Sequence, residues 1–372
     1  MDILFLCGSA QAGKDGVGDY TRRLCGNLIR SGHKAQILSL CDQQVISFTT
    51  ENQEIEETIV VVHRIPISTE NEQRFIWTQR VVRELEPDWI SLQFVPYSFN
   101  PKGLPFWLSS FLKKIKGNHK WHIMLHELWV GMDLNDTYKS KCIGLLQKNL
   151  ILKILKFKKE IALSTQTDLY HYKITELGYN AQLLPLFSNI IKNVESGLET
   201  AKDDLELRFC IFGNIHYGAP VEKFLNDLKL ALSLSEKKKR VKFFFIGNCG
   251  SAIAEWEKVL LEHHIDVEIE ITGFATDSDI SDLLLKCQYG ISTTPYLLNQ
   301  KSGSLAAMFE HQLPVLCIAR NWRTKNFRQK KFLNLTEYEN QASIIKFIST
   351  KFIASDENSL ESVALKFVEG LK

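Results

Sequence analysis

The sequence lacks the patterns that mark secreted, membrane-spanning and nucleic-acid-binding proteins. Its 372 residues carry a net charge of +2, so no global excess of basic residues favours a polyanionic partner. No apolar run approaches the length of a membrane span. The N-terminal "MDILFLCGS" has an acid at its second position and too short an apolar run for a signal peptide. These absences predict a cytoplasmic protein that does not bind nucleic acid.

Cysteine pairs and metal-ligand spacings are also missing. The eight cysteines are scattered without a C-x-x-C pair, and most lie in apolar contexts where free cysteine behaves as a small hydrophobe. The histidines form no ligand constellation. We therefore expect a reducing compartment, no bound metal and no cofactor.

The chain instead has ample material for two α/β domains. Its hydrophobic fraction is 45%, and 372 residues exceed one ordinary core. Short β-rich apolar runs alternate with amphipathic stretches from end to end, which predicts parallel sheets covered on both faces. The polar segment Ser188–Asp204 separates the halves. The predicted fold is therefore two doubly wound, Rossmann-like domains facing across a cleft, with ligands at the carboxyl ends of the strands.

The stretch "FLCGSAQAGKDGVGDYTRRL" imitates a phosphate-binding P-loop. Gly8, Gly13 and Lys14 spell G-x-x-x-x-G-K, but Asp15 stands where a P-loop has Ser or Thr. The glycines that follow delay the predicted helix to about 19–31, and no apolar strand ends in the expected partner Asp. The pattern argues against a nucleotide hydrolase.

Two other interpretations of this loop stay open. In one, the glycines serve only the backbone geometry of a turn. In the other, Gly16, Val17 and Gly18 open a helix whose unhindered N–H groups face an anionic ligand. Asp19 would then cap that helix or accept a hydrogen bond from a sugar hydroxyl.

A second glycine-containing loop, in "TTPYLLNQKSGSLAAMFEHQLPVL", follows the same logic in the second half. A strand ends near Thr294, and Lys301, Ser302, Gly303 and Ser304 open a helix. Ser302 is a good N-cap residue and Lys301 supplies a positive charge. A purely structural cap is the alternative. Taken together, the two loops predict a diphosphate held across the cleft.

Several local motifs carry a family resemblance in the same order along the chain. They are "GVGDYTRRL", "ISLQFVPYSFNPKGLP", "HELW", "LLPLFSNI", "IFGNI" and "KSGSLAAMFEHQLPVL". With them the chain resembles the GT-B glycosyltransferases, in particular the retaining family 4 enzymes. The resemblance implies an acceptor-binding domain over 1–187, a nucleotide-sugar-binding domain over 188–350, and a C-terminal helix over 351–372 that packs back on the first domain.

The resemblance also implies roles for individual residues. Near the donor diphosphate and the acceptor it places Gly16, Val17 and Gly18, with Asp19 beside the acceptor and His126 beside the transferred sugar. At the nucleotide sugar it places Gly213, Asn214 and His216 in the loop that opens the donor site, Gly273 and Phe274 at the nucleobase, and Lys301, Ser302, Gly303 and Ser304 at the diphosphate. His126 is equally compatible with a satisfied core histidine at a strand end.

The sequence departs from the family where charge is expected. The two glutamates usual around the last helix fall at Asn299 and Ala307, and the usual Arg and Lys of the donor site fall near His216 and Ala219. The predicted function is transfer of a sugar from a nucleotide-diphosphate sugar to an acceptor hydroxyl, with retention and without metal, in glycan or glycoconjugate biosynthesis. The acceptor is a glycan, a lipid-linked or a small molecule. The alternative is a non-catalytic GT-B-like partner or scaffold protein.

Two further stretches have competing interpretations. The basic amphipathic segment 145–160 predicts a surface helix whose apolar stripe, with Leu146, Leu150, Ile154 and Phe157, faces the core. Its alternative is peripheral contact with anionic lipid at the inner membrane face. The "DSD" at Asp277–Asp279 predicts a helix cap rather than a metal-binding pair.

Overall fold

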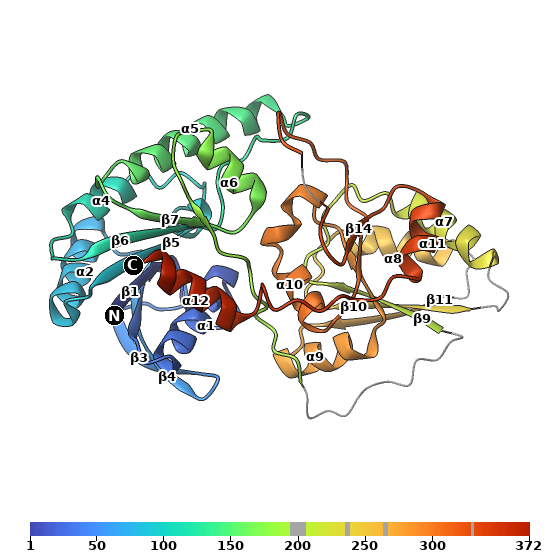
Figure 1. Cartoon of the computed structure of the whole chain (residues 1–372), viewed down its shortest axis with the longest axis horizontal. Coiled ribbons are helices and arrows are strands. Elements are labelled where there is room, and N and C mark those ends of the chain that lie inside the picture. The colour runs from blue at the N-terminus through green and yellow to red at the C-terminus, as the bar shows by residue number, and fades with distance from the viewer. Residues whose placement is uncertain (194–205, 235–238, 263–266, 329–330) are drawn as a thin grey trace. The chain divides into compact units, whose positions relative to one another are not determined.

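The computed structural model describes residues 1–193, 206–234, 239–262, 267–328 and 331–372. The chain divides into two compact units (Figure 1). Unit 1 comprises Met1–Phe187, Arg323–Phe327 and Glu357–Lys372, and unit 2 comprises Ser188–Trp322 and Arg328–Asp356. Of the predicted linker, residues 194–204 lie outside the described residues.

Unit 1 is built on an eight-stranded sheet with the order β3-β4-β2-β1-β5-β6-β7-β8. All neighbouring strands are parallel except β3 and β4, which pair antiparallel. Central strands such as β5, "WISLQF", are buried on both faces, which explains their nearly continuous apolar sequence. The strands span Asp2–Cys7 (β1), Lys34–Asp42 (β2), Thr49–Ile55 (β3), Thr58–Pro66 (β4), Trp89–Phe94 (β5), Lys120–Leu125 (β6), Ala162–Thr165 (β7) and Gln182–Leu183 (β8).

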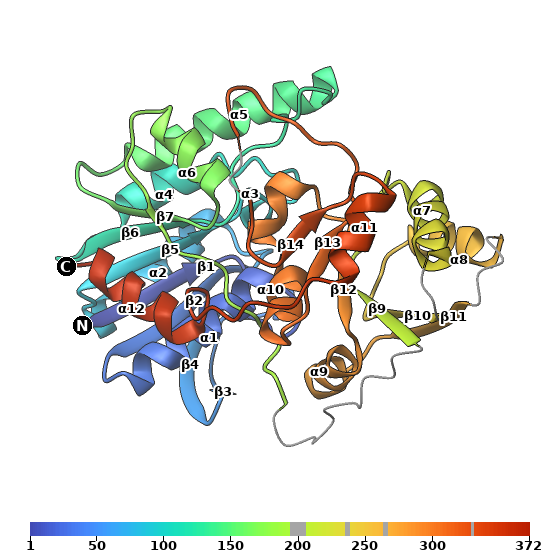
Figure 2. The same cartoon turned by 45° about the vertical axis from the view of Figure 1, so that its right-hand side comes forward.

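Helices cover both faces of this sheet, and the last of them returns from the C-terminal end of the sequence. Helix α12 packs beside α1, and the rings of Phe5 on β1 and Phe367 on α12 stack at 5.6 Å (Figures 1 and 2). The two chain termini therefore lie side by side in unit 1. The helices span Gly16–Arg30 (α1), Asn71–Leu85 (α2), Pro96–Phe99 (α3), Leu108–Lys114 (α4), Tyr138–Leu155 (α5), Asp168–Thr175 (α6) and Leu360–Gly370 (α12).

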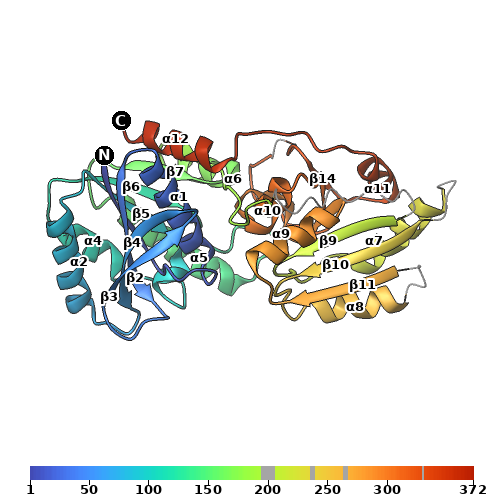
Figure 3. The same cartoon turned by 90° about the horizontal axis from the view of Figure 1, so that it is seen from below.

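Unit 2 holds a six-stranded, fully parallel sheet with the order β11-β10-β9-β12-β13-β14 (Figure 3). Counted within the unit, this is the doubly wound order 3-2-1-4-5-6, whose direction reverses between β9 and β12. In unit 1 the corresponding reversal lies between β1 and β5. The strands of unit 2 span Glu206–Phe212 (β9), Arg240–Ile246 (β10), Val267–Gly273 (β11), Tyr289–Ser292 (β12), Val315–Cys317 (β13) and Leu335–Glu337 (β14).

The helices of unit 2 begin at side chains that cap them. Thr276 and Asp279 form a reciprocal capping box at the start of α9, which confirms the predicted cap at Asp277–Asp279. Ser302 accepts a hydrogen bond from Leu305 N at 3.2 Å and caps α10, again as predicted. The helices span Val221–Ser233 (α7), Ile253–Glu262 (α8), Asp277–Lys286 (α9), Gly303–Glu310 (α10) and Gln341–Ile348 (α11), with a 3₁₀ turn over Tyr296–Lys301 (η1).

The structure confirms two doubly wound α/β units and corrects one helix start. Helix α1 begins at Gly16, three residues before the predicted start, because Asp15 rather than Asp19 caps it. In the amphipathic segment 145–160, Leu150, Ile154 and Phe157 are buried as predicted, whereas Leu146 is 46% exposed. The core-facing stripe therefore begins one helical turn later than predicted.

Candidate functional site

The loop between β1 and α1 satisfies its own helix terminus. Asp15 Oδ1 accepts hydrogen bonds from Val17 N at 2.9 Å and from Gly18 N at 2.8 Å. We predicted that these N–H groups face an anionic ligand unhindered, and this expectation is wrong for both. The carboxylate that breaks the P-loop pattern already occupies the place of the anion.

Asp19 secures the same loop to the helix. Its Oδ1 accepts hydrogen bonds from Gly13 N at 3.0 Å and from Arg22 Nη1 at 3.1 Å. Burial raises the pKa of this carboxyl, and the Arg22 guanidinium partly opposes that effect. Its predicted capping role belongs to Asp15, while its predicted place near an acceptor stays a proposal.

Two glycines bring the loop close to its neighbours at the reversal of strand order. A Cβ added to Gly8 would collide with the backbone of Ser98, just after β5, and one added to Gly18 would lie 2.5 Å from Ser9 O. Gly18 therefore serves close packing. Gly16 has open space around its Cα, so a ligand can approach the backbone there.

His126 follows β6 at the same edge of the sheet and is only 3% exposed. Its Nε2 donates to Gln93 Oε1 at 2.9 Å, and Gln93 Nε2 donates to Ser91 Oγ at 2.7 Å. From Ser91 the hydrogen bonds continue through His122 to Ser164. Burial lowers the pKa of His126 to about 3, so its ring is neutral at physiological pH.

Two buried polar atoms beside His126 have no hydrogen-bond partner among the described residues. They are the Tyr20 hydroxyl and Gln166 Nε2. The Tyr20 ring meets the His126 ring edge-on with centroids 4.9 Å apart, and Gln166 raises the pKa of His126 slightly through a hydrogen bond. Buried polar groups are nearly always satisfied, so these two atoms can bond a ligand hydroxyl or an ordered water. Sequence reasoning missed both residues.

In unit 2, the loop after β9 meets the loop after β12 at the reversal of strand order. Gly213 has a φ of +74°, and a Cβ there would lie 2.7 Å from Ser304 Oγ, so this position requires glycine. His216 N donates to Thr293 Oγ1 at 2.9 Å. The predicted residues Gly213, His216 and Ser304 are thus neighbours within one unit. The cavity lined by Ser304 and by Asn214, the neighbour of Gly213, has a volume of only about 10 Å³. Any diphosphate must therefore lie on their open side.

Three positively charged or basic groups gather at this edge. Burial lowers the pKa of His216, and the nearby Lys301 and Arg320 lower it further by repelling its proton. Gly303, the first residue of α10, has open space around its Cα. The combination of a helix N-terminus, an open glycine and neighbouring cations suits an anion.

Arg320 was not predicted from the sequence. It follows β13, and its side chain contacts the loop after β9, since a Cβ on Gly218 would lie 3.4 Å from Arg320 Cβ. The signal in the sequence is one arginine after an apolar strand. It becomes informative only when β13 is known to lie beside β12.

The predicted nucleobase position lies at the edge of the same sheet. Gly273 ends the edge strand β11 and bridges to Gly247, while Phe274 is 87% exposed. The loop after β10 continues toward the donor loop, because a Cβ on Gly250 would collide with Asn214 Oδ1. An exposed aromatic ring at this strand end offers a stacking surface.

Asn299 and Ala307, the positions at which the resemblance would place two glutamates, are both buried. Asn299 is 1% exposed; its Oδ1 accepts from Ser292 Oγ at 2.7 Å and its Nδ2 donates to Thr294 O at 2.8 Å. Ala307 is 1% exposed within the core of unit 2. Asn299 therefore holds the loop after β12, and Ala307 packs the core.

The described ranges hold neither a metal-binding cluster nor a membrane-spanning helix. There, no group of three or more His, Cys, Asp or Glu side chains is placed to hold a metal ion. None of the helices in those ranges combines the length and the apolar character needed to cross a membrane.

Comparison with known proteins shows the fold. No family model and no curated protein matches the sequence. Sucrose-phosphate synthase from Thermosynechococcus elongatus aligns over 100% of this chain and 94% of its own, with a TM-score of 0.60 and 9% identity. Anabaena HepE, in complex with UDP and glucose, aligns over 100% and 94% (TM-score 0.57, 12% identity). The lipopolysaccharide outer core galactosyltransferase WaaB, in its apo form, aligns over 100% and 99% (0.55, 12%). The chain thus has the GT-B fold of these proteins.

Proposed function

We propose that this protein is a glycosyltransferase that moves a sugar from a nucleotide-diphosphate sugar to an acceptor hydroxyl. The observation that carries the proposal is the cluster of Lys301, Arg320 and His216 beside the open N-terminus of α10. It lies where strand order reverses in a doubly wound sheet, the position at which such sheets bind ligands. A fold shared with proteins that bind UDP and glucose or transfer galactose supports the same conclusion.

In this proposal unit 2 binds the donor. The diphosphate lies against Lys301, Ser302, Gly303 and Ser304, with Gly213, Asn214 and His216 on its other side. Phe274 stacks on the nucleobase next to Gly273. Lys301 and Arg320 stabilise the negative charge that grows on the leaving diphosphate, so no metal ion is required.

Unit 1 binds the acceptor in this proposal. Gly16 approaches it with its backbone, Val17 lies beside it with its N–H held by Asp15, Gly18 keeps this helix start packed in place, and Asp19 lies nearby. His126 is neutral, so it positions hydroxyl groups instead of acting as a cationic acid. The leaving phosphate takes the acceptor proton, which makes a strong protein base unnecessary if the reaction proceeds with retention. We also propose that the protein is a retaining enzyme of family 4 and that it acts in the cytoplasm.

The experiment is a donor screen followed by a cation-removing variant. The protein is incubated with a panel of nucleotide sugars, and release of nucleoside diphosphate is measured with and without mixed acceptor sugars. Lys301→Gln should lower kcat/KM on the active donor by about 10²-fold, the scale seen when one charge-stabilising donor is lost. Lys286→Gln, on the far end of α9, is the control. Release that is equal in wild type and Lys301→Gln contradicts the assignment.

One observation favours a second candidate, a non-catalytic GT-B-like protein. Asn299 and Ala307 stand where the family has carboxylates, and both are buried without charge. Such a protein would bind a nucleotide sugar without turning it over. Nucleotide binding without release of nucleoside diphosphate from any donor of the panel supports this candidate.

A further inference from the structure

Unit 1 contains a cavity that is lined by none of the site residues described above. Its volume is about 660 Å³, and all its lining residues belong to unit 1. Its floor is the loop that continues from His126 through Trp129 to Leu134, and its walls are α5 and α6. A cavity of this size suits a small-molecule ligand.

The cavity is bordered by a short segment from far along the sequence, Arg323–Phe327, which we call the strap. Leu134 N donates to Arg323 O at 2.8 Å, and Arg323 N donates to Asp133 Oδ1 at 3.3 Å. On the other side, Lys173 Nζ donates to Lys325 O at 3.5 Å. These bonds fix the strap to the loop and to α6, so the cavity has a defined border.

The charge of the lining is predominantly positive. Four lysines face two carboxylates: Lys141, Lys148, Lys173 and Lys325 against Asp133 and Glu176. The acids are already engaged. Asp133 is 2% exposed and accepts backbone hydrogen bonds, and Glu176 pairs with Lys173 at 2.8 Å, which lowers the pKa of its carboxyl.

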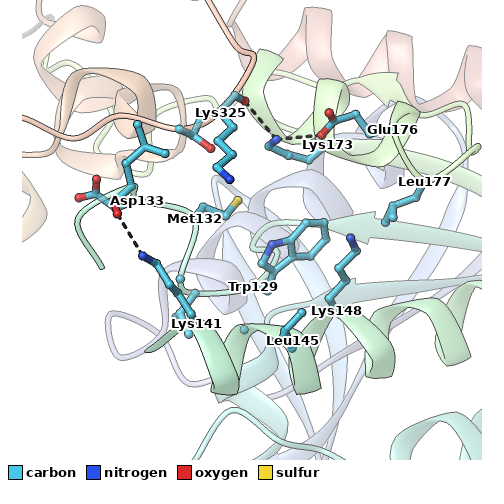
Figure 4. A pocket seen from close by; sticks show the side chains of 15 residues that line it. Trp129, Met132, Asp133, Lys141, Leu145, Lys148, Lys173, Glu176, Leu177 and Lys325 are labelled. Atoms are coloured by element: carbon cyan, nitrogen blue, oxygen red, sulfur yellow. Dashed lines mark hydrogen bonds and ion pairs between the residues drawn. The ribbon is translucent and has the colours of Figure 1, made fainter. Parts of the chain in front are cut away.

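Two of the lysines remain for a ligand. Lys148 Nζ lies 5.4 Å from the centre of the Trp129 ring, and Lys325 extends from the strap toward the same ring (Figure 4). Among the described residues neither ammonium group forms an ion pair, although Lys148 lies near enough to Glu176 to help lower the pKa of that carboxyl. By contrast, Lys141 donates to Leu134 O at 3.0 Å and helps to hold the loop. Two ammonium groups beside an indole form a site for an anion attached to an apolar or carbohydrate body.

We propose that this cavity binds a phosphate-bearing part of the acceptor, with Lys148 and Lys325 on the phosphate and Trp129 against the adjoining body. The proposal rests on the proposed glycosyl transfer, because it is the shared loop, with Trp129 three residues after His126, that connects the cavity to the acceptor site. The phosphate is either that of a soluble phosphorylated acceptor or that of a membrane-held one, since both present the same chemistry to the lysines.

The test locates an anion by lysine footprinting. Amine acetylation of the full-length protein is quantified residue by residue, with inorganic pyrophosphate in one arm and with phosphatidylcholine vesicles containing phosphatidylglycerol in the other. We expect acetylation of Lys148 and Lys325 to slow by at least about threefold in one arm. That arm then shows whether the bound phosphate is that of a soluble or of a membrane-held acceptor. Lys139, exposed on α5 outside the cavity, should stay unprotected, and Lys301 separately reports binding in unit 2.

Variants make the test decisive. In Lys148→Gln/Lys325→Gln, pyrophosphate or vesicle affinity should fall by about tenfold or more, whereas Lys148→Arg and Lys139→Gln should retain it. Nucleoside diphosphate binding to unit 2 should be unchanged in all three variants. If neither arm protects the cavity lysines, or if Lys139 is protected equally, the proposal is wrong. If the cavity lysines are protected but no nucleoside diphosphate binds unit 2, the proposed function is wrong and the anion site in unit 1 is still supported.

Discussion

The Asp15 carboxylate accepts a hydrogen bond from the Gly18 N–H at 2.8 Å, so the first helix of unit 1 carries its own anion. A ligand phosphate there would meet a negative charge and N–H groups that are already bonded. The corresponding helix of unit 2 differs in kind. Its cap, Ser302, is neutral, its first residue is the open Gly303, and Lys301 lies beside it. This contrast assigns the diphosphate to unit 2 in the proposed function.

Asp15 should therefore be important for stability rather than for nucleotide binding. Asp15→Ala removes the acceptor for two N–H groups and should cost about 1 kcal/mol of unfolding free energy, or about 2–4 °C in Tm. Asp15→Asn retains an oxygen acceptor and should be close to wild type. Calorimetry and nucleotide titration check both. A variant with wild-type Tm that has lost nucleotide binding would contradict the assigned role.

The buried histidines should make stability depend on pH. Burial lowers the pKa of His126 to about 3, and that of His122 likewise, below the ordinary value of 6.5. Below pH 6.5 the unfolded chain therefore binds more protons than the folded one, and stability falls as pH falls. Each histidine should lower the free energy of unfolding by about 1.4 kcal/mol for each pH unit below 6.5, down to its folded pKa of about 3.

Urea unfolding at pH 7, 6 and 5 measures this dependence. His126→Gln keeps a hydrogen-bonding side chain without a titrating ring, so its unfolding free energy should fall less steeply with decreasing pH than that of wild type. His33→Gln, at the surface of unit 1, serves as the comparison because His33 is much less buried. Equal slopes in wild type and His126→Gln would refute a neutral His126.

The unpartnered Tyr20 hydroxyl predicts a split between stability and activity. Tyr20→Phe removes a buried polar atom that has no partner among the described residues, so Tm should stay unchanged or rise. If an acceptor hydroxyl uses this group, the KM for the acceptor should rise by about tenfold with donor KM unchanged. Steady-state kinetics with the donor held in excess provides the measurement. An unchanged acceptor KM would mean that the Tyr20 hydroxyl bonds an ordered water and not the acceptor.

Placing a carboxylate at Ala307 should destabilise this protein. Ala307 is 1% exposed in the core of unit 2, so Ala307→Glu would bury a charge and should destabilise by about 3 kcal/mol or more. Ala307→Ser is the small polar control. Thermal unfolding and nucleotide titration of both variants check the expectation. A stable Ala307→Glu protein with tighter nucleotide binding would mean that the position faces the ligand.

The fold could be predicted from the sequence because most of its helices and strands show the hydrophobic periodicity of their type, about 3.6 residues in helices and about 2 in strands. Strand β3 was missed because its sequence, "TTENQEI", is polar and half exposed along an edge. The start of α1 was misplaced because two glycines weaken helix propensity, whereas the Asp15 hydrogen bonds outweigh that cost. Local propensity described the segments, and capping decided their ends.

The candidate site was only partly readable. Lys301–Ser304 was predicted from local signals, a glycine and a capping serine after a strand, whereas Gly213 was expected only from the family resemblance. The roles of Arg320 and of the cavity lysines could not be predicted from the sequence. Each depends on residues that are distant in sequence and close in space, as Lys148 and Lys325 are. Tyr20 reads as an ordinary core residue until its hydroxyl is found without a partner.

The most direct measurement of the central claim is calorimetric titration with UDP, GDP, ADP and CDP of wild type, Gly303→Asp and Gly303→Ser. Gly303 faces open space at the start of α10, so both variants should fold, and only the aspartate repels a diphosphate. We predict that one nucleoside diphosphate binds wild type and Gly303→Ser alike, with at least about tenfold weaker binding to Gly303→Asp. No binding by any of the four, or equal binding to all three proteins, would contradict the proposed function.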